Sequence, residues 1–276
     1  MSRFLKLLNF EYHRFSKVYL VLLSITILSQ IVGVYVLSRN YLKRMQEVVY
    51  EYGHSINDFI QSHGTMNMIK ITHSIWFIGP IALCVISLLI YLFIIWYRES
   101  YGRSTFIKRL FIMSMPRMNI FFTKLISILI MVFGLIALQI LLLYVSSELL
   151  TWIVPNDFRT DYTISEIIRH TELKIFIPES FTELILIYGI GLMFVVVLFT
   201  IILFERSFQL RGILIGTVYG AVTVVVFTLP MMAQTILNKK LFHNSDLVSL
   251  EVLLGLIIVI SSLFVSRYLL NHKVTV

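Results

Sequence analysis

The sequence carries little charge for its length. Only 14% of its 276 residues are Asp, Glu, Lys or Arg, whereas a soluble domain has about 25%. Hydrophobic residues make up 58% of the chain, and its mean hydropathy is +0.87. Too little polar surface is available to face water, which excludes a soluble globular enzyme. The 21 Phe and 14 Tyr residues exclude a disordered chain, because disorder requires low hydrophobicity.

Cysteine and catalytic motifs are also scarce. The only cysteine, Cys84, excludes an internal disulfide, and its apolar neighbours predict a small buried side chain. The sequence contains no G-x-x-x-x-G-K-[ST], no H-E-x-x-H and no G-x-S-x-G. We therefore expect a non-catalytic chain that itself binds no cofactor.

The most prominent feature that the sequence does have is a set of long apolar runs. Six runs lie near residues 18–38, 75–97, 120–146, 181–204, 212–234 and 250–268. Each has about the 20 residues that a helix needs to cross the hydrocarbon core of a bilayer. The runs are continuous rather than alternating, which favours helices over a transmembrane β-barrel. The sequence thus predicts an all-α polytopic membrane protein with a single transmembrane domain over residues 1–276.

Basic residues are concentrated on one side of these runs. If the N-terminus is cytoplasmic, the inner segments and adjoining span ends hold 14 of the 23 basic residues but only 3 of the 15 acidic residues. The positive-inside rule then predicts that both termini are cytoplasmic. Membrane orientation and contact with anionic lipid account for the net charge of +8. Nucleic acid binding is therefore not expected.

The first 17 residues predict an amphipathic helix in the membrane interface. Four side chains share one face at helical spacing: Phe4, Leu8, Tyr12 and Phe15. Most of the cations lie off this face, as in helices that lie along a membrane surface. Glu11 is an exception inside the apolar arc. It either pairs locally with Arg14, three residues on, or contacts another inner segment.

Two outer segments, 39–74 and 147–180, are long enough to hold short helices, which we expect within 41–60 and 163–173. Five of the seven histidines fall on this outer side. Their spacing matches no compact metal-ligand motif, so no metal site is predicted.

The fifth run contains a ridge of small residues at four-residue spacing, formed by Gly212, Gly216 and Gly220. Such a ridge lets a second helix approach closely. That helix can belong to the same chain or to a second copy. Further along the run, Pro230 predicts a break near the outer end.

The inner segment 98–119 concentrates charged, aromatic and turn residues. In chain order, it and the start of the next run carry Glu99, Gly102, Arg103, Phe106, Arg109, Leu110, Pro116, Arg117 and Lys124. This order resembles the loop between the second and third spans of type-2 ABC exporter permeases. The interfacial helix, six spans and cytoplasmic termini also resemble that family. Met115 and Met118 depart from it, because small or hydroxyl residues often flank the proline there.

The resemblance implies a coupling helix that docks on a separate ABC ATPase subunit, which binds ATP and Mg. The chain would then be a permease in a bacterial plasma membrane, paired with a second copy of itself or with a related permease. A hydrophobic or amphipathic substrate, either a peptide or a lipid-like molecule, is expected.

The residue types in this segment suit docking. Phe106 and Leu110 lie one helical turn apart and would form an apolar knob. Arg103 and Arg109 can pair with carboxylates of a partner or with lipid. Gly102 permits a tight turn, and Pro116 ends a helix before the third span. The competing interpretation is an ordinary inner loop whose cations only set orientation.

Two other functions remain open from the sequence. The chain could be an ion-coupled secondary transporter or channel that acts alone, or a signalling or assembly subunit. The midplanes of all six runs lack Asp, Glu, Lys and Arg. Ion-coupled transport normally requires such groups within the membrane, which disfavours the first of these alternatives.

Overall fold

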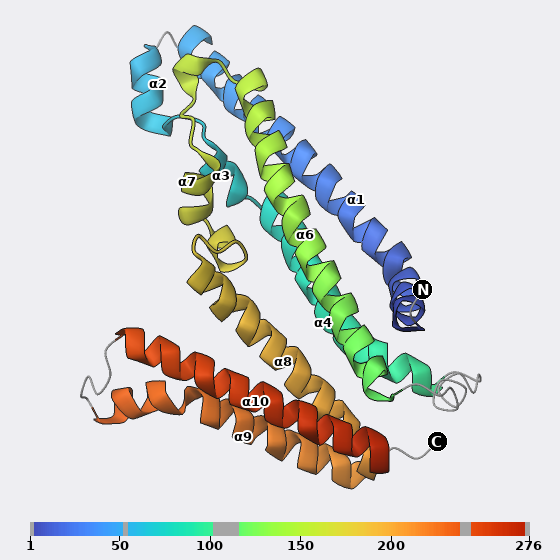
Figure 1. The fold of residues 1–276 in the computed structure, drawn as a ribbon. Coiled ribbons are helices and arrows are strands. Elements are labelled where there is room, and N and C mark those ends of the chain that lie inside the picture. The colour runs from blue at the N-terminus through green and yellow to red at the C-terminus, as the bar shows by residue number, and fades with distance from the viewer. Residues whose placement is uncertain (1–2, 52–54, 102–115, 238–243, 274–276) are drawn as a thin grey trace. The chain divides into compact units, whose positions relative to one another are not determined.

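The computed structural model describes residues 3–51, 55–101, 116–237 and 244–273, and over them it is 89% helical with no β-strand. Six helices are long and apolar enough to cross a membrane (Figure 1). They are α1 (Arg3–Gln46), α4 (Ile75–Tyr101), α6 (Met118–Ile153), α8 (Phe181–Phe208), α9 (Leu210–Leu237) and α10 (Asn244–His272). Each contains the whole of one predicted run. The all-α class and the six candidate spans are therefore confirmed.

Short helices occupy the two segments predicted to be outside. They are η1 (Glu47–Glu51), α2 (Ile56–His63), α3 (Met68–Thr72), η2 (Asn156–Phe158), α7 (Ile164–Arg169) and η3 (Glu172–Ile175). Thr163 starts α7 with a capping box, in which the side chains of Thr163 and Glu166 each accept the other's backbone N–H. These bonds hold the pKa of the Glu166 carboxyl below its ordinary value. The helix expected within 163–173 is thus present.

The predicted interfacial helix is not a separate element. Residues 3–17 and the first span belong to one 44-residue helix, α1. The stretch 3–46 contains no proline and only one glycine, Gly33, so the sequence offers nothing that ends the helix early. At 1.5 Å per residue its contour length is roughly 66 Å, about twice the thickness of a hydrocarbon core. Only the uncharged stretch 18–38 suits the membrane interior.

Two prolines lie inside long helices, Pro80 in α4 and Pro230 in α9. The break predicted at Pro230 is wrong, because α9 continues to Leu237. A proline removes one backbone donor and crowds the carbonyl four residues earlier. Membrane-spanning helices tolerate this loss because neighbouring groups satisfy the freed carbonyl.

Contacts divide the chain into two compact units. The first unit comprises Met1–Asn9, Tyr91–Ser127 and Ser180–Val276, and the second comprises Phe10–Ile90 and Ile128–Glu179. The single transmembrane domain over residues 1–276 stays a prediction.

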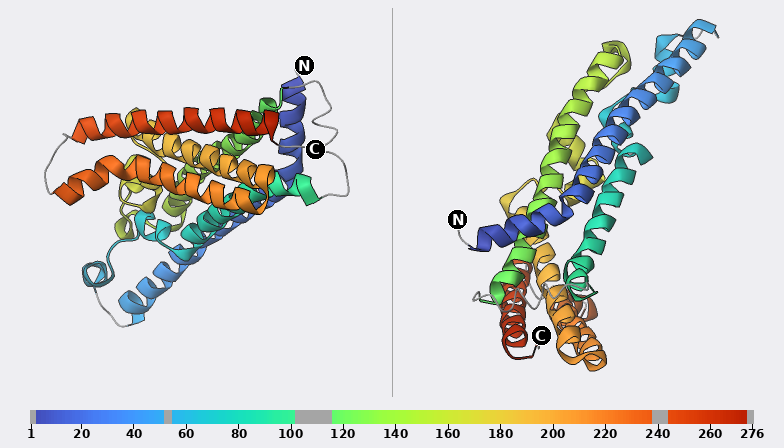
Figure 2. Two further views of the ribbon diagram at one scale, coloured as in Figure 1. Left: turned by 90° about the horizontal axis from the view of Figure 1, so that it is seen from below. Right: turned by 90° about the vertical axis from the view of Figure 1, so that its right-hand side faces the viewer.

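The second unit combines parts of α1, α4 and α6, which run side by side in the views of Figures 1 and 2. Gln30 of α1 donates from its amide to Gln139 of α6 at 2.9 Å, and both side chains are buried. Gly33 of α1 admits α4, because a Cβ there would lie 2.5 Å from the Trp76 Cβ. Small and amide side chains thus bring these helices together.

A hydrophobic core joins the short helices to the ends of α1, α4 and α6 within the second unit. Its buried members include Met45, Phe59, Met66, Met68, Ile71, Phe77, Leu150, Val154, Phe158, Ile167 and Leu173. Backbone bonds connect the two predicted outer segments, since Met66 N donates to Phe158 O and Thr160 N donates to Met66 O. The two segments therefore form one packed cap rather than two independent loops.

The first unit contains α8, α9 and α10, which lie side by side in both figures. A single residue, Gln209, separates α8 from α9 and has φ of 54°. Hydroxyl groups link the helices: Thr200 of α8 lies 2.9 Å from Ser266 of α10. Tyr219 of α9 lies 2.7 Å from Ser262 of α10.

The glycine ridge of α9 packs on α8 of the same chain. A Cβ built on Gly212 would lie 2.0 Å from the Phe204 carbonyl oxygen. Cβ atoms on Gly216 and Gly220 would lie 3.0 and 2.8 Å from side-chain carbons of Ile201. The predicted ridge therefore contacts an intramolecular partner, the first of the two alternatives.

Candidate functional site

The predicted coupling residues lie partly outside the described residues. Five of them fall in 102–115, for which nothing structural is stated: Gly102, Arg103, Phe106, Arg109 and Leu110. Glu99 belongs to the last turn of α4. Pro116 and Arg117 directly precede α6, and Lys124 lies in its second turn. The structure thus shows the two helices that flank the segment.

Lys124 connects these two flanking helices. Its side chain is fully buried, and its Nζ donates a 2.8 Å hydrogen bond to the Ile95 carbonyl oxygen of α4. The same Nζ lies 5.1 Å from the centre of the Trp96 ring. A buried ammonium is costly unless partners replace its hydration. A carbonyl and an aromatic face supply such partners.

Three buried aromatic rings surround this contact. Trp96 of α4 lies 6.3 Å from Phe121 of α6 and 5.3 Å from Phe199 of α8, between ring centres. Phe121 and Phe199 are 5.5 Å apart and edge-to-face. Such pairs contribute about 0.5–1.5 kcal/mol each beyond the area that they bury. The rings therefore hold the ends of α4, α6 and α8 together.

Polar contacts extend the cluster to the last turns of α8. The Tyr97 hydroxyl donates to Oε2 of Glu205. The Arg206 guanidinium lies 5.6 Å from the centre of the Trp96 ring and 6.0 Å from that of Tyr97. We call this set the aromatic–cation cluster, and its members are Trp96, Tyr97, Phe121, Lys124, Phe199, Glu205 and Arg206.

Sequence reasoning found only Lys124 among these residues. The others lie near span ends, where aromatic and basic residues commonly sit at the membrane–water interface. Because that preference applies to most span ends, it does not distinguish residues with specific contacts from residues that only face the interface. The available signal was the recurrence of neighbouring aromatic and charged residues at two span ends, Trp96-Tyr97-Arg98-Glu99 and Phe204-Glu205-Arg206.

The predicted interfacial residues have mixed environments. Glu11 and Phe15 are buried, with 2% and 5% of their surface exposed, whereas Phe4, Leu8 and Arg14 are half-buried. Tyr12 is exposed, so the buried face of α1 includes Glu11 in its place. The Arg14 guanidinium lies 5.5 Å from the centre of the Phe10 ring. A position for this helix at a membrane surface stays a prediction.

Over the described part of the chain, no group of three or more His, Cys, Asp or Glu side chains is arranged to hold a metal ion. On the predicted outer side, His63 stacks on Phe59 with ring centres 4.8 Å apart. His170 Nδ1 lies 2.8 Å from the Glu166 carbonyl oxygen. These two histidines therefore have structural contacts within the cap.

Comparison with known proteins gives no relative. No family model matches the chain, and no curated protein or solved structure is significantly similar to it.

Proposed function

We propose that the chain is the membrane-spanning permease subunit of an ATP-driven ABC exporter, with ATP hydrolysed on a separate subunit. The aromatic–cation cluster carries this proposal. Lys124 and Trp96 join the two helices that flank segment 98–119, and Phe199 and Arg206 join them to α8. A displacement of the segment by a docked ATPase would pass to α8 through these packed contacts.

Sequence features supply the rest of the support. The chain has six candidate spans but no nucleotide-binding motif. It also lacks ionisable residues at the span midplanes, where an ion gradient would be used. Energy would therefore come from a partner that binds ATP and Mg. A second copy or a related permease would complete the path for a hydrophobic or amphipathic peptide or lipid-like substrate.

The test is a pair of charged substitutions in the predicted coupling helix. Phe106→Asp with Leu110→Asp places two carboxylates on the apolar docking face. Each large side chain contributes about 1.5–3 kcal/mol when fully buried, so binding of the ATPase should weaken strongly. Insertion should remain normal, because both positions lie outside the six apolar runs. Affinity purification from native membranes, followed by an ATP hydrolysis assay, measures the loss.

The matched control is Ser100→Asp with Ser104→Asp, which adds the same charge at the same four-residue spacing but outside the predicted apolar knob. It should retain more ATPase than the first variant. Equal retention by the two variants would contradict the coupling helix. Substrate movement by the purified wild-type chain alone would contradict the proposed function and favour a secondary transporter.

A further inference from the structure

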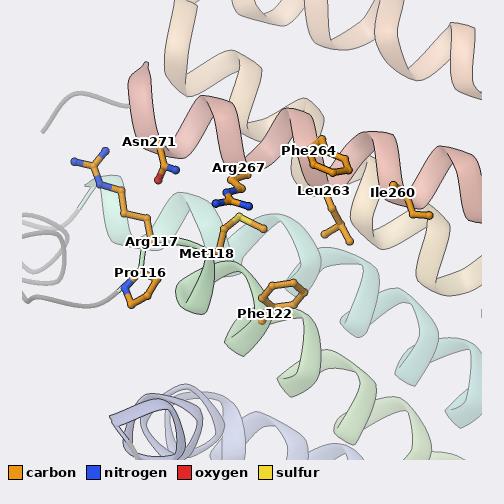
Figure 3. A pocket seen from close by; sticks show the side chains of 9 residues that line it. All are labelled: Pro116, Arg117, Met118, Phe122, Ile260, Leu263, Phe264, Arg267 and Asn271. Atoms are coloured by element: carbon orange, nitrogen blue, oxygen red, sulfur yellow. The ribbon is translucent and has the colours of Figure 1, made fainter.

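A cavity of about 520 Å³ lies between the start of α6 and the C-terminal half of α10 (Figure 3). Its lining residues are Pro116, Arg117, Met118, Phe122, Ile260, Leu263, Phe264, Arg267 and Asn271. The volume falls within the range of about 300–1,000 Å³ that is typical of ligand sites. The lining includes two arginines and no acidic residue, so the cavity is suited to an anion.

The cavity is polar at one end and apolar at the other. On α10, Ile260, Leu263 or Phe264, Arg267 and Asn271 follow one another at three- or four-residue spacing, which places them on one helix face. In Figure 3 the arginines lie toward the end marked by Asn271, and Phe122 and Ile260 lie toward the other. The distance from residue 260 to 271 is roughly 16 Å along a helix. That is about half a hydrocarbon core.

The two arginines are differently held. Arg117 donates from Nη1 to the Leu270 carbonyl oxygen, which keeps its guanidinium beside the last turns of α10. Arg267 is exposed and forms no hydrogen bond or ion pair with any residue that the structure describes. A guanidinium presents donors in a planar fork that matches a phosphate. Arg267 is therefore available for an anionic group.

The apolar end is also open to an occupant. Phe264 and Ile260 keep 66% and 53% of their surface exposed, and both belong to a helix that can span a membrane. A soluble anion would leave these side chains uncovered. An acyl chain would cover them while its headgroup reached the arginines, and basic pockets between spanning helices favour such anionic headgroups.

We propose that this cavity binds one anionic phospholipid, with its phosphate at Arg117 and Arg267 and an acyl chain along Phe122, Leu263 and Phe264. This inference requires only that α6 and α10 cross a membrane, and it does not depend on the proposed transport function. The headgroup contact should hold the start of α6 against the end of α10.

The test uses the full chain purified into nanodiscs. Phosphatidylglycerol, added to a phosphatidylcholine background, should remain bound after exchange and should raise the melting temperature. Arg267→Gln should weaken its retention, measured by native mass spectrometry, roughly tenfold or more, because charge-assisted hydrogen bonds are lost. Arg211→Gln is the matched control, since Arg211 is exposed at the start of α9 and does not line the cavity. This control should bind lipid as the wild type does.

Two further measurements identify the occupant. Leu263→Trp fills the apolar end while keeping both arginines, and it should also reduce lipid retention. Glycerol phosphate, which has the headgroup without acyl chains, should neither stabilise the detergent-solubilised chain nor displace the lipid. Equal lipid retention by Arg267→Gln and Arg211→Gln would overturn the proposal. Protection by free glycerol phosphate would overturn it in favour of a soluble anion. Unchanged retention in Leu263→Trp would overturn the placement of the acyl chain.

Discussion

Trp96 contributes to the aromatic–cation cluster through the packing of its ring rather than through a hydrogen bond from its indole N–H. Its indole Nε1 is buried and has no hydrogen-bond partner among the described residues. An unsatisfied buried donor costs free energy. The faces and edges of the ring, by contrast, contact Phe199, Lys124 and Arg206. Packing and cation–π attraction therefore explain a tryptophan at this position.

This interpretation predicts different effects for two substitutions of Trp96. Trp96→Phe keeps an aromatic ring and removes the unsatisfied donor, so it should cost less than about 1.5 kcal/mol. Trp96→Ala removes the ring and should cost about 3–5 kcal/mol. Unfolding of the purified chain in detergent, followed by the intrinsic fluorescence of Trp76 and Trp152, measures both. A large loss in Trp96→Phe would show that the indole donor has a partner.

The buried amide pair between α1 and α6 leads to a second prediction. Gln30→Leu leaves the Gln139 amide without its partner at 2.9 Å, which should cost about 1–3 kcal/mol. Gln30→Leu combined with Gln139→Leu should recover part of this loss. The coupling energy from the double-mutant cycle should be about 0.6–1.7 kcal/mol, as for other hydrogen bonds between membrane helices. Additive losses would show that the two amides do not interact.

At the scale of helices, sequence reasoning succeeded where a signal is local. Each apolar run is helical in the structure, and the glycine ridge of α9 packs against α8. Both features could be read from the sequence because the periodicity of apolar residues and the size of a residue are local properties. The predicted break at Pro230 is wrong because the helix-breaking tendency of one residue does not decide whether a helix that packs against neighbouring helices continues. Residues 3–17 continue into the first span within α1 because nothing between residues 17 and 18 ends a helix, and their place at a membrane surface stays a prediction.

The cap of the second unit and the aromatic–cation cluster were missed for a different reason. Phe59 packs against Phe158, which is distant in sequence, with ring centres 6.5 Å apart. Trp96 and Phe199 meet in the same way at 5.3 Å. Such pairs appear only when helices are placed in space, since each residue alone is an ordinary apolar side chain. Lys124 was named only because it completes the residue order that resembles the permease family, and its contacts with α4 were not foreseen.

Matched glycine substitutions test the packing of α8 and α9. Gly212→Ala places a Cβ 2.0 Å from the Phe204 carbonyl oxygen, so the helices must separate and the chain should lose about 1–3 kcal/mol. Gly191→Ala is the control, because no atom lies within 4 Å of its Cβ position. It should be neutral or stabilising by up to about 1 kcal/mol, since alanine favours a helix. Equal melting temperatures for the two variants would show that α9 does not pack on α8 through this ridge.

For the whole molecule, orientation rests on charge. The apolar helices make the chain compatible with a multi-pass membrane protein, but a helix of uncharged residues crosses a bilayer equally well in either direction. The asymmetry lies in the connections: those grouped with the N-terminus hold 14 of the 23 basic residues. By the positive-inside rule, the loops that carry the excess of basic residues face the cytoplasm. The cap formed by residues 39–74 and 147–180 should therefore face the outside.

Cysteine labelling in intact cells tests this orientation. The native Cys84 is buried, and Cys84→Ala provides a background without other thiols. Asp157 is exposed in the cap, so Asp157→Cys should react with a membrane-impermeant maleimide. It is a better reporter than Thr160, whose hydroxyl lies 2.6 Å from that of Thr65. Ser104→Cys, in the segment predicted to be cytoplasmic, should react only after the cells are opened.

The reverse pattern would place the cap inside. It would also place segment 98–119 where no cytoplasmic ATPase could reach it, so this experiment tests the orientation and the proposed function together.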